Sequence, residues 1–407
     1  MRPCSLLAVI LTAASLGSFA PATHAATPRL PGVGDAMEEM VARNEIAGAV
    51  TLVVTPDRIL HQETTGLADV ASQRPMAPDT LFWIASMTKP VTAVAVLMLQ
   101  DEGRLHVSDP VARYIPEFGT LRTPSGRPAN LTLTQILTHT SGLGEANGPA
   151  AQQARTLADL VPLWLSGPTQ FEPGETWRYC QSGINAAGRV VEVVSGQPFH
   201  VFLKRRLFDP LGMKDTTFYP TEAQRRRLVT AYARNATNGL LEPVPPRADF
   251  GSTNRPPQGN GGLFSTGPDY ARFCQMLLGG GAYKGRRYLS PEAMRHLNTP
   301  LTGDLPTGFF QNDTFGQHGT KYGWGLGTCV LKTPHDGVAA MLSPGTFGHG
   351  GAWGTQAWID PLRGVACILM VQRANFPNSD ASDVRRAFQA AAVAQLNLTS
   401  NHASRRR

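Results

Sequence analysis

The β-rich segments of this chain lie near its two ends, and this distribution constrains the fold more than any other feature. Near the N-terminus, the runs AGAVTLVVTPD and RILHQETTGLADV are joined by a Pro-Asp turn and predict a hairpin. Beyond residue 320 the sequence is again rich in β-forming residues, and the turn DPLRG joins the last two β-rich runs. The segment between contains helical pieces and many glycines and prolines. We therefore predict an α+β fold (broadly α/β) with one antiparallel sheet built from both chain ends and flanked by helices.

The same distribution predicts how the chain is divided. Its 407 residues suit one large domain or two. We expect one domain over residues 26–397, with a sheet subdomain formed by residues 26–85 and 320–397. A mostly helical subdomain, residues 86–319, is inserted between the two parts of the sheet. We expect residues 398–407 to be a basic, disordered tail.

Composition and charge exclude some classes of protein. Hydrophobic residues make up 42% and charged residues 16%, as in folded proteins with a substantial core. The net charge is +7, and part of it comes from the final SRRR. The other basic residues form no run with interleaved aromatics, so we expect no nucleic-acid partner.

The N-terminal segment has the pattern of a secretory signal peptide over residues 1–25. One arginine precedes an apolar run from Leu6 to Leu16, and THA at residues 23–25 resembles a cleavage site. The run is short for a membrane span, so we expect a periplasmic or extracellular protein without stable membrane insertion. An uncleaved anchor is the alternative. The four later cysteines show no CxxC spacing and are expected to be single buried thiols.

A serine and a lysine lie three residues apart in WIASMTKP, which contains Ser86 and Lys89. Three-residue spacing on a helix brings side chains together, and Pro90 fits the first helical turn. A buried lysine loses proton affinity and can act as a base near neutral pH. The plain alternative is that Ser86 caps the helix and Lys89 is exposed. The elbow G-x-S-x-G of other serine hydrolases is absent, as are H-E-x-x-H and phosphate-binding loops.

Two further motifs lie far down the chain. Tyr179 stands just ahead of an amphipathic helical pattern that ends at Gly196. His349, Gly350 and Gly351 begin a β-run, where the glycines allow a substrate or a neighbouring loop to approach closely.

With these motifs, the chain resembles the serine β-lactamase and penicillin-binding-protein superfamily, in its class C-like branch. That branch includes family VIII carboxylesterases, D-aminopeptidases and DD-peptidases. The matching stretches include FWIASMTKPVTAVAVLMLQDEGRLHVSDPV, LTLTQILTHTSGL, YGWGLG and GHGGAWGT, and they cover about residues 45 to 395.

The resemblance implies the β-lactamase-like fold and a set of roles. Ser86 would be the acylated nucleophile, with Lys89 and Tyr179 as its acid–base partners. A tyrosine beside ammonium groups is expected to have a lowered pKa. The oxyanion hole would be formed by the backbone N–H groups of Ser86 and Ala352. No metal or cofactor is implied.

Two positions depart from the lactamase pattern. Gln181 stands where Y-x-N has asparagine, and His349-Gly350-Gly351 stands where lactamases have Lys-Thr-Gly. Gln181 keeps an amide for substrate binding, whereas His349 is mostly neutral at pH 7. The loss of a permanent charge favours esters over β-lactams, which carry a carboxylate. Trp353 either lines the acyl pocket or caps the core, and His139 is expected to be structural, bonded to backbone.

These observations predict an exported serine hydrolase that forms an acyl-enzyme on Ser86, acting as a carboxylesterase of small acyl esters. The nearest alternatives are a D-amino-acid peptidase or DD-carboxypeptidase and a β-lactamase, so the substrate is a small ester, amide or peptide. A non-catalytic module that binds cell-wall peptide is a further alternative, but it would fit a broken catalytic set better. The sequence does not determine the oligomeric state.

Overall fold

The computed structural model describes residues 27–245, 250–308, 319–376 and 380–404. The expected signal peptide, residues 1–25, lies outside the described residues. In the part of the chain that the structure describes, no helix combines the length and apolarity needed to cross a membrane.

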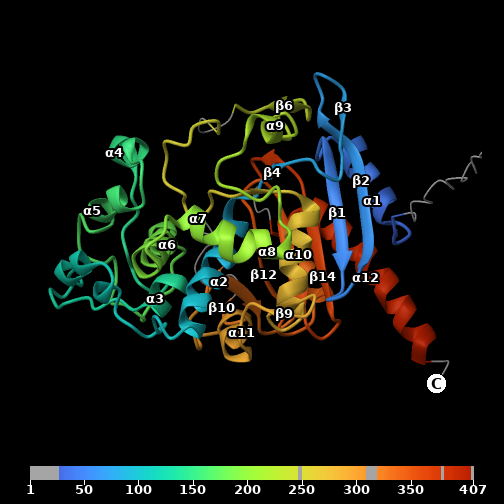
Figure 1. The fold of residues 1–407 in the computed structure, drawn as a ribbon. Coiled ribbons are helices and arrows are strands. Elements are labelled where there is room, and N and C mark those ends of the chain that lie inside the picture. The colour runs from blue at the N-terminus through green and yellow to red at the C-terminus, as the bar shows by residue number, and fades with distance from the viewer. Residues whose placement is uncertain (1–26, 246–249, 309–318, 377–379, 405–407) are drawn as a thin grey trace, which may run out of the picture.

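An eight-stranded antiparallel sheet is the main sheet of the fold, and it lies toward the α1 and α12 side of the molecule (Figure 1). Its strand order is β10-β11-β12-β13-β14-β1-β2-β3, so strands from the two ends of the chain meet where β1 pairs with β14. This confirms the predicted α+β fold with a sheet built from both ends. The strands are β1 (Gly48–Val54), β2 (Ile59–Asp69), β3 (Arg74–Pro75), β10 (Tyr322–Gly325), β11 (Thr328–Leu331), β12 (Phe347–Gly350), β13 (Gln356–Asp360) and β14 (Val365–Met370).

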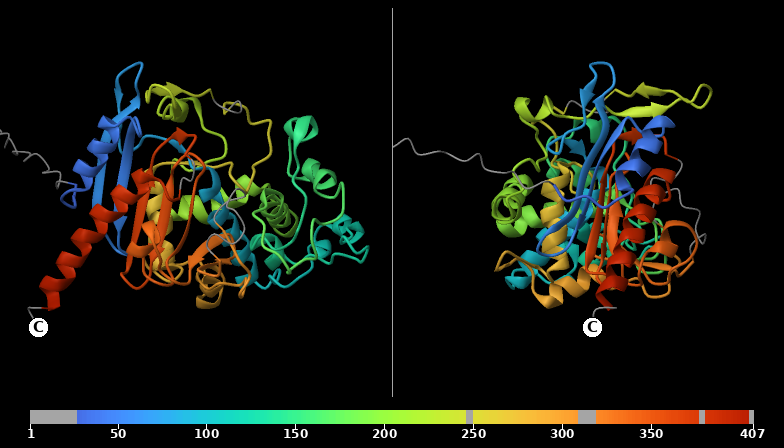
Figure 2. Two further views of the ribbon diagram at one scale, coloured as in Figure 1. Left: turned by 180° about the vertical axis from the view of Figure 1, so that it is seen from behind. Right: turned by 90° about the vertical axis from the view of Figure 1, so that its right-hand side faces the viewer.

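Helices cover both faces of this sheet. On one face lie α1 (Val33–Ala42) and α12 (Asp383–Ser404), whose apolar side chains pack with those of β1 and β14. On the other face α10 (Gly267–Leu278) contacts the same two strands (Figure 2). Because both faces are covered, every residue of β1 and β14 is buried. Helix α12 continues to Ser404, into the segment expected to be a disordered tail.

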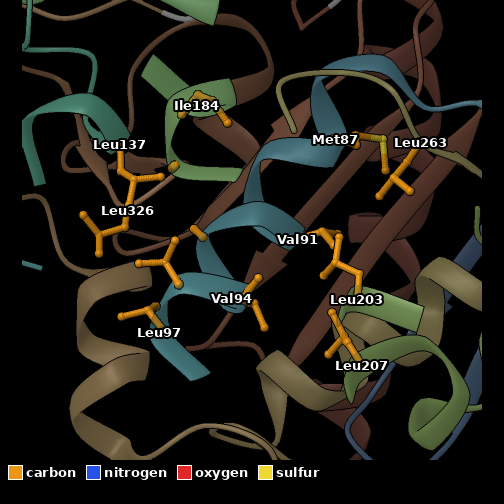
Figure 3. Close-up of a cluster of buried hydrophobic side chains, with 14 of the residues drawn as sticks. Met87, Val91, Val94, Leu97, Leu137, Ile184, Leu203, Leu207, Leu263 and Leu326 are labelled. Atoms are coloured by element: carbon orange, nitrogen blue, oxygen red, sulfur yellow. The ribbon is translucent and has the colours of Figure 1, made fainter. Parts of the chain in front are cut away.

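Helix α2 (Thr88–Asp101) is the buried axis between the sheet and the other helices. Figure 3 shows its side chains Val91, Val94 and Leu97, with Met87 just before the helix, among apolar side chains from other elements. The four are fully buried, together with the partners Leu137, Ile184, Leu203, Leu207, Leu263 and Leu326. Packing on all sides explains why this segment is apolar throughout rather than on one face. It also fixes the start of the helix, where Ser86 and Lys89 lie.

The inserted segment is mostly helical, and α3, α4 and α5 form the end of the molecule farthest from α1 and α12 (Figure 1). Its helices are η1 (Ala85–Met87), η2 (Val111–Arg113), η3 (Pro116–Thr120), α3 (Leu133–Leu137), α4 (Gly148–Gln153), η4 (Ala158–Leu160), α5 (Val161–Trp164), α6 (Gln181–Ser195), α7 (Phe199–Leu203), η5 (Lys204–Phe208), α8 (Asp209–Leu211), α9 (Glu222–Arg225) and α11 (Pro291–Asn298), with η6 (Gly337–Met341) following later. Short strand pairs connect them: β4 (Phe82–Trp83) with β7 (Phe264–Ser265), β5 (Tyr232–Arg234) with β6 (Leu241–Pro243) and β15 (Arg373–Ala374), and β8 (Ala282–Tyr283) with β9 (Arg286–Arg287).

Candidate active site

Ser86 lies in a tight turn between β4 and α2. The turn is the 3₁₀ segment η1, and α2 begins two residues after Ser86, so the helix starts later than a serine cap would require. Ala85 has a φ of +43°, a left-handed conformation that is strained for a residue with a side chain. The turn is held by Thr88, whose hydroxyl donates to the Ala85 carbonyl at 2.7 Å. Such strain directly before Ser86 is typical of functional sites.

Lys89 is fully buried, which rules out the alternative of an exposed lysine. Its Nζ donates to Ser86 Oγ at 3.0 Å and to the main-chain carbonyl of Asn260 at 2.7 Å. Burial lowers the pKa of Lys89 to about 7, although the nearby Glu145 carboxylate opposes this shift. A substantial fraction of the amine is therefore uncharged at neutral pH and can accept a proton.

Tyr179 stands at the other side of Ser86, just before α6. Its hydroxyl is hydrogen-bonded to Ser86 and lies 3.2 Å from Nε2 of His349, and its ring lies 4.7 Å from Lys89 Nζ. Burial raises the pKa of Tyr179 well above its usual value. The sequence-based expectation of a lowered pKa is therefore wrong. That expectation included nearby ammonium groups but omitted the loss of water around a buried phenol, which disfavours the phenolate.

His349, at the end of β12, is 3% exposed and uses both ring nitrogens. Its Nδ1 lies 2.6 Å from the Gly350 carbonyl, which can only accept, so this nitrogen carries the proton. Nε2 then accepts from the Tyr179 hydroxyl. Burial and the Lys89 charge lower the pKa of His349 to about 3, so the ring is neutral. It therefore fixes the direction of the Tyr179 hydroxyl and offers no charge to an anion.

The two glycines after His349 allow close approach of neighbouring parts of the protein. A Cβ on Gly351 would lie 2.6 Å from the carbonyl oxygen of Ile84, two residues before Ser86. A Cβ on Gly350 would meet the Asp380 carboxylate and the Gln356 side chain. Neighbouring parts of the protein thus require glycine at these positions: the nucleophile turn at Gly351, and the Asp380 and Gln356 side chains at Gly350.

Ala352 is the residue directly after Gly351. It is exposed, and within the described residues its N–H donates to no other group. The backbone amide is therefore available to a ligand oxygen beside Ser86.

The side-chain amide of Gln181 is hydrogen-bonded to another residue of the site. Its Oε1 accepts from Asn260 Nδ2 at 2.9 Å, and the N–H of Asn260 donates to Asn185 Oδ1 at 3.1 Å. Asn260 thus connects Gln181 to Lys89 through its side chain and its carbonyl. Sequence reasoning missed Asn260, and the signal available was the glycine-rich run GNGG that contains it.

Glu145 is a second residue that the sequence did not reveal. Its carboxylate accepts from the backbone N–H groups of Gln181 at 2.6 Å and Ser182 at 2.9 Å, so it caps the N-terminus of α6. This contact orients the helix that follows Tyr179. His139 behaves as expected, because its Nδ1 accepts from the Cys180 N–H at 3.1 Å. The four cysteines of the described chain are buried and form no disulfide, also as expected: Cys180, Cys274, Cys329 and Cys367.

Two cavities lie beside the nucleophile turn, and Trp83 and Phe250 line both. One has a volume of about 230 Å³ and includes Trp353 in its wall. The other, of about 520 Å³, extends along Gly261 and Gly262. Trp353 thus lines a cavity and is also buried at 5% exposure. Among the described residues, no His, Cys, Asp and Glu side chains are grouped as ligands for a metal ion.

Comparison with known proteins places this geometry in a family. The family model described as Beta-lactamase matches residues 33–392, nearly the whole described chain. The chain belongs to the beta-lactamase family. It is a serine hydrolase of the superfamily that contains β-lactamases and penicillin-binding proteins, as the resemblance implied.

Relatives within the beta-lactamase family include esterases and peptidases. The chain is 32% identical to esterase EstB of Burkholderia gladioli, over 89% of this chain and 95% of the relative. It is 27% identical to a putative D-alanyl-D-alanine carboxypeptidase of Escherichia coli, over 81% of this chain and 79% of the relative. The solved structure of EstCE1, a hydrolase with promiscuous acyltransferase activity, shares the fold with a TM-score of 0.75 at 22% identity, covering 89% of this chain and 97% of that chain.

Proposed function

We propose that the chain is an exported carboxylesterase that is acylated on Ser86. The observation that carries this proposal is the buried Lys89 Nζ, 3.0 Å from Ser86 Oγ, with a pKa of about 7. A nucleophilic serine needs a base within hydrogen-bond reach that is uncharged at the working pH, and Lys89 meets both requirements.

The first half of the proposed reaction transfers the acyl group to the enzyme. The uncharged Lys89 amine takes the Ser86 hydroxyl proton while Oγ attacks the ester carbonyl carbon. The carbonyl oxygen gains the displaced electron pair and is stabilised by the N–H groups of Ser86 and Ala352. The bond to the alcohol oxygen then breaks, and the proton held by Lys89 passes to that oxygen.

The second half returns the enzyme to its starting state. Water attacks the acyl carbon and gives its proton to Lys89. Collapse releases the carboxylic acid, and the proton returns to Ser86 Oγ. Tyr179 remains neutral, and its hydroxyl, directed by His349, holds Ser86 and the leaving oxygen in place.

The state of His349 supports an ester rather than a β-lactam as the substrate. A β-lactam carries a carboxylate, and family members that cleave it place a permanent charge at this motif. His349 is buried and neutral, and both of its nitrogens are already bonded. A small neutral ester requires no such charge. Peptidase activity remains the alternative that the Escherichia coli relative favours.

The pH dependence of ester hydrolysis should report Lys89. The value of kcat/KM for a p-nitrophenyl ester is expected to rise through an apparent pKa near 7, falling about tenfold for each pH unit below it. Tyr179 and His349 should not add further inflections to the pH profile. The pKa of Tyr179 lies well above 10, and that of His349 is about 3. A profile that is flat between about pH 5 and 9 would contradict Lys89 as the base.

Covalent labelling tests the nucleophile and substrate assays rank the alternatives. A fluorophosphonate probe should label Ser86, as located by mass spectrometry, and the label should be lost in Lys89→Ala. The absence of an adduct at Ser86 with any acyl donor would overturn the proposal. We expect p-nitrophenyl esters to be cleaved faster than nitrocefin or D-alanyl peptides, and the reverse order would favour the lactamase or the peptidase.

The proposal of export rests on the N-terminal sequence. N-terminal sequencing of the protein from the periplasm or medium is expected to begin at Ala26, after removal of residues 1–25. Retention of the full chain in the membrane fraction would instead favour an uncleaved anchor.

A further inference from the structure

The cavity of about 230 Å³ lies next to the nucleophile turn. Trp83 lies three residues before Ser86, and Trp353 directly follows Ala352. Their ring centroids are 5.4 Å apart. Trp83 is fixed from two sides, since its indole Nε1 donates to the Gly261 carbonyl at 2.7 Å and its backbone N–H donates to Gln372 Oε1 at 3.1 Å. The cavity therefore has rigid aromatic walls that adjoin both proposed oxyanion amides.

Lys89 and Tyr179, whose Nζ and ring centroid are 4.7 Å apart, lie in a different part of the site from Trp353. Tyr179 belongs to an aromatic cluster with Trp177 and Trp324, whereas Trp353 belongs to a separate cluster with Ala85 and Ala374. An ester's leaving oxygen has to lie beside Lys89 and Tyr179 to receive a proton. The acyl group, on the other side of the carbonyl carbon, then extends toward Trp83 and Trp353.

The lining of this cavity is mostly apolar, and its polar members are Thr230, Gln372 and Arg225. Leu228, Val229, Val244 and Phe250 contribute apolar surface, and Arg225 is the one charged residue among the described lining residues. Arg225 is exposed, so this charged part of the lining is in contact with solvent.

Arg225 differs from its two neighbours in its partners. Arg226 pairs with Glu222 at 2.7 Å, and Arg227 pairs with Asp215. Within the described residues Arg225 donates only to the Pro220 carbonyl, at 2.9 Å, and has no carboxylate partner. A mostly apolar cavity with an exposed cation in its lining complements a chain that is apolar along its length and anionic at its end.

We propose that this cavity binds the acyl part of the substrate, an apolar chain that ends in a carboxylate held by Arg225. This rests on the proposed esterase function and specifies its substrate as a half-ester of a dicarboxylic acid. Water cleaves the ester to give a dicarboxylate and an alcohol, and the distal carboxylate takes no part in bond breaking. The distal carboxylate is at the acyl end, away from the neutral His349.

The test compares two esters of equal acyl length, p-nitrophenyl hexanoate and the mono-p-nitrophenyl ester of adipic acid. The wild-type protein should show the higher kcat/KM for the adipate ester. In Arg225→Gln, the ratio of the two kcat/KM values should fall about threefold to tenfold, as expected for an exposed to partly buried ion pair. Added salt should lower the wild-type ratio in the same direction.

Arg226→Gln is the matched control, because it removes the neighbouring arginine, directly after the end of α9, and should leave the ratio unchanged. Val244→Phe narrows the cavity and should lower the ratio of hexanoate to acetate hydrolysis. No preference for the adipate ester, or an equal effect of Arg226→Gln, would overturn the inference. If p-nitrophenyl acetate itself is not hydrolysed, the proposed function fails. If acetate is hydrolysed without carboxylate preference, only this inference fails.

Discussion

Replacing Lys89 by methionine is expected to abolish ester hydrolysis while making the protein more stable. Methionine has similar length and flexibility and needs no water around its end. Without the base, kcat/KM for p-nitrophenyl esters should fall by about 10³-fold or more. The free energy of unfolding at pH 7 should rise by about 2 kcal/mol, because a buried lysine that loses proton affinity destabilises the folded state.

The sign of the stability change follows from the pKa of Lys89, which burial lowers from 10.5 to about 7. Between these pH values the unfolded chain binds a proton at Lys89 that the folded chain does not bind. The folded state therefore loses stability as the pH falls from about 10.5 to 7, and the loss is complete below 7. The gain in Lys89→Met should accordingly be largest at or below pH 7 and should disappear near pH 10.5.

Denaturant unfolding at several pH values, with activity measured on the same samples, checks this expectation. Lys214→Met is a suitable control, because Lys214 is exposed and its replacement should change neither activity nor stability appreciably. A destabilised Lys89→Met protein, or one that keeps its activity, would contradict the assignment of Lys89 as a catalytic base whose burial destabilises the folded state.

Replacing Gly351 by alanine is expected to lower kcat by about 10²-fold with a smaller effect on KM. The added Cβ would lie 2.2 Å from Thr355 Oγ1 and 2.6 Å from the Ile84 carbonyl oxygen, so the segment that follows β12 has to move away from the nucleophile turn. Such a shift displaces the Ala352 amide from a developing oxyanion, and the loss of one such donor has an effect of this size.

Gly119→Ala is the matched control for this variant. Gly119 is exposed, and a Cβ there would meet no atom within 4 Å, so activity should be unchanged. Circular dichroism should show that Gly351→Ala remains folded. A folded Gly351→Ala protein with the kcat of wild type would argue against an oxyanion role for the Ala352 amide.

The parts of the fold and site that sequence reasoning predicts are those with a local signal. β-rich runs bounded by turns at both ends predicted the strands that meet at β1 and β14. The three-residue spacing of Ser86 and Lys89 predicted that the side chains meet, and the apolar helix behind them predicted a buried lysine. In each case a few neighbouring residues determine the outcome.

The parts that could not be predicted depend on contacts between distant segments. Asn260 holds Lys89 through its backbone carbonyl, which any residue could supply, so its side-chain identity carries no signal for this contact. Glu145 caps α6 from a loop far earlier in the chain. The raised pKa of Tyr179 results from complete burial, which only the assembled fold produces.

The pairing of β1 with β14 has a consequence for how the protein folds. These central strands come from opposite ends of the chain, so the sheet cannot close until nearly all of the chain has been synthesised. A nascent chain that ends before β14 leaves β1 without its neighbour, as an apolar edge open to pairing with other chains. Closing so long a loop also slows folding. The last segments to leave the ribosome are therefore the ones that complete the molecule.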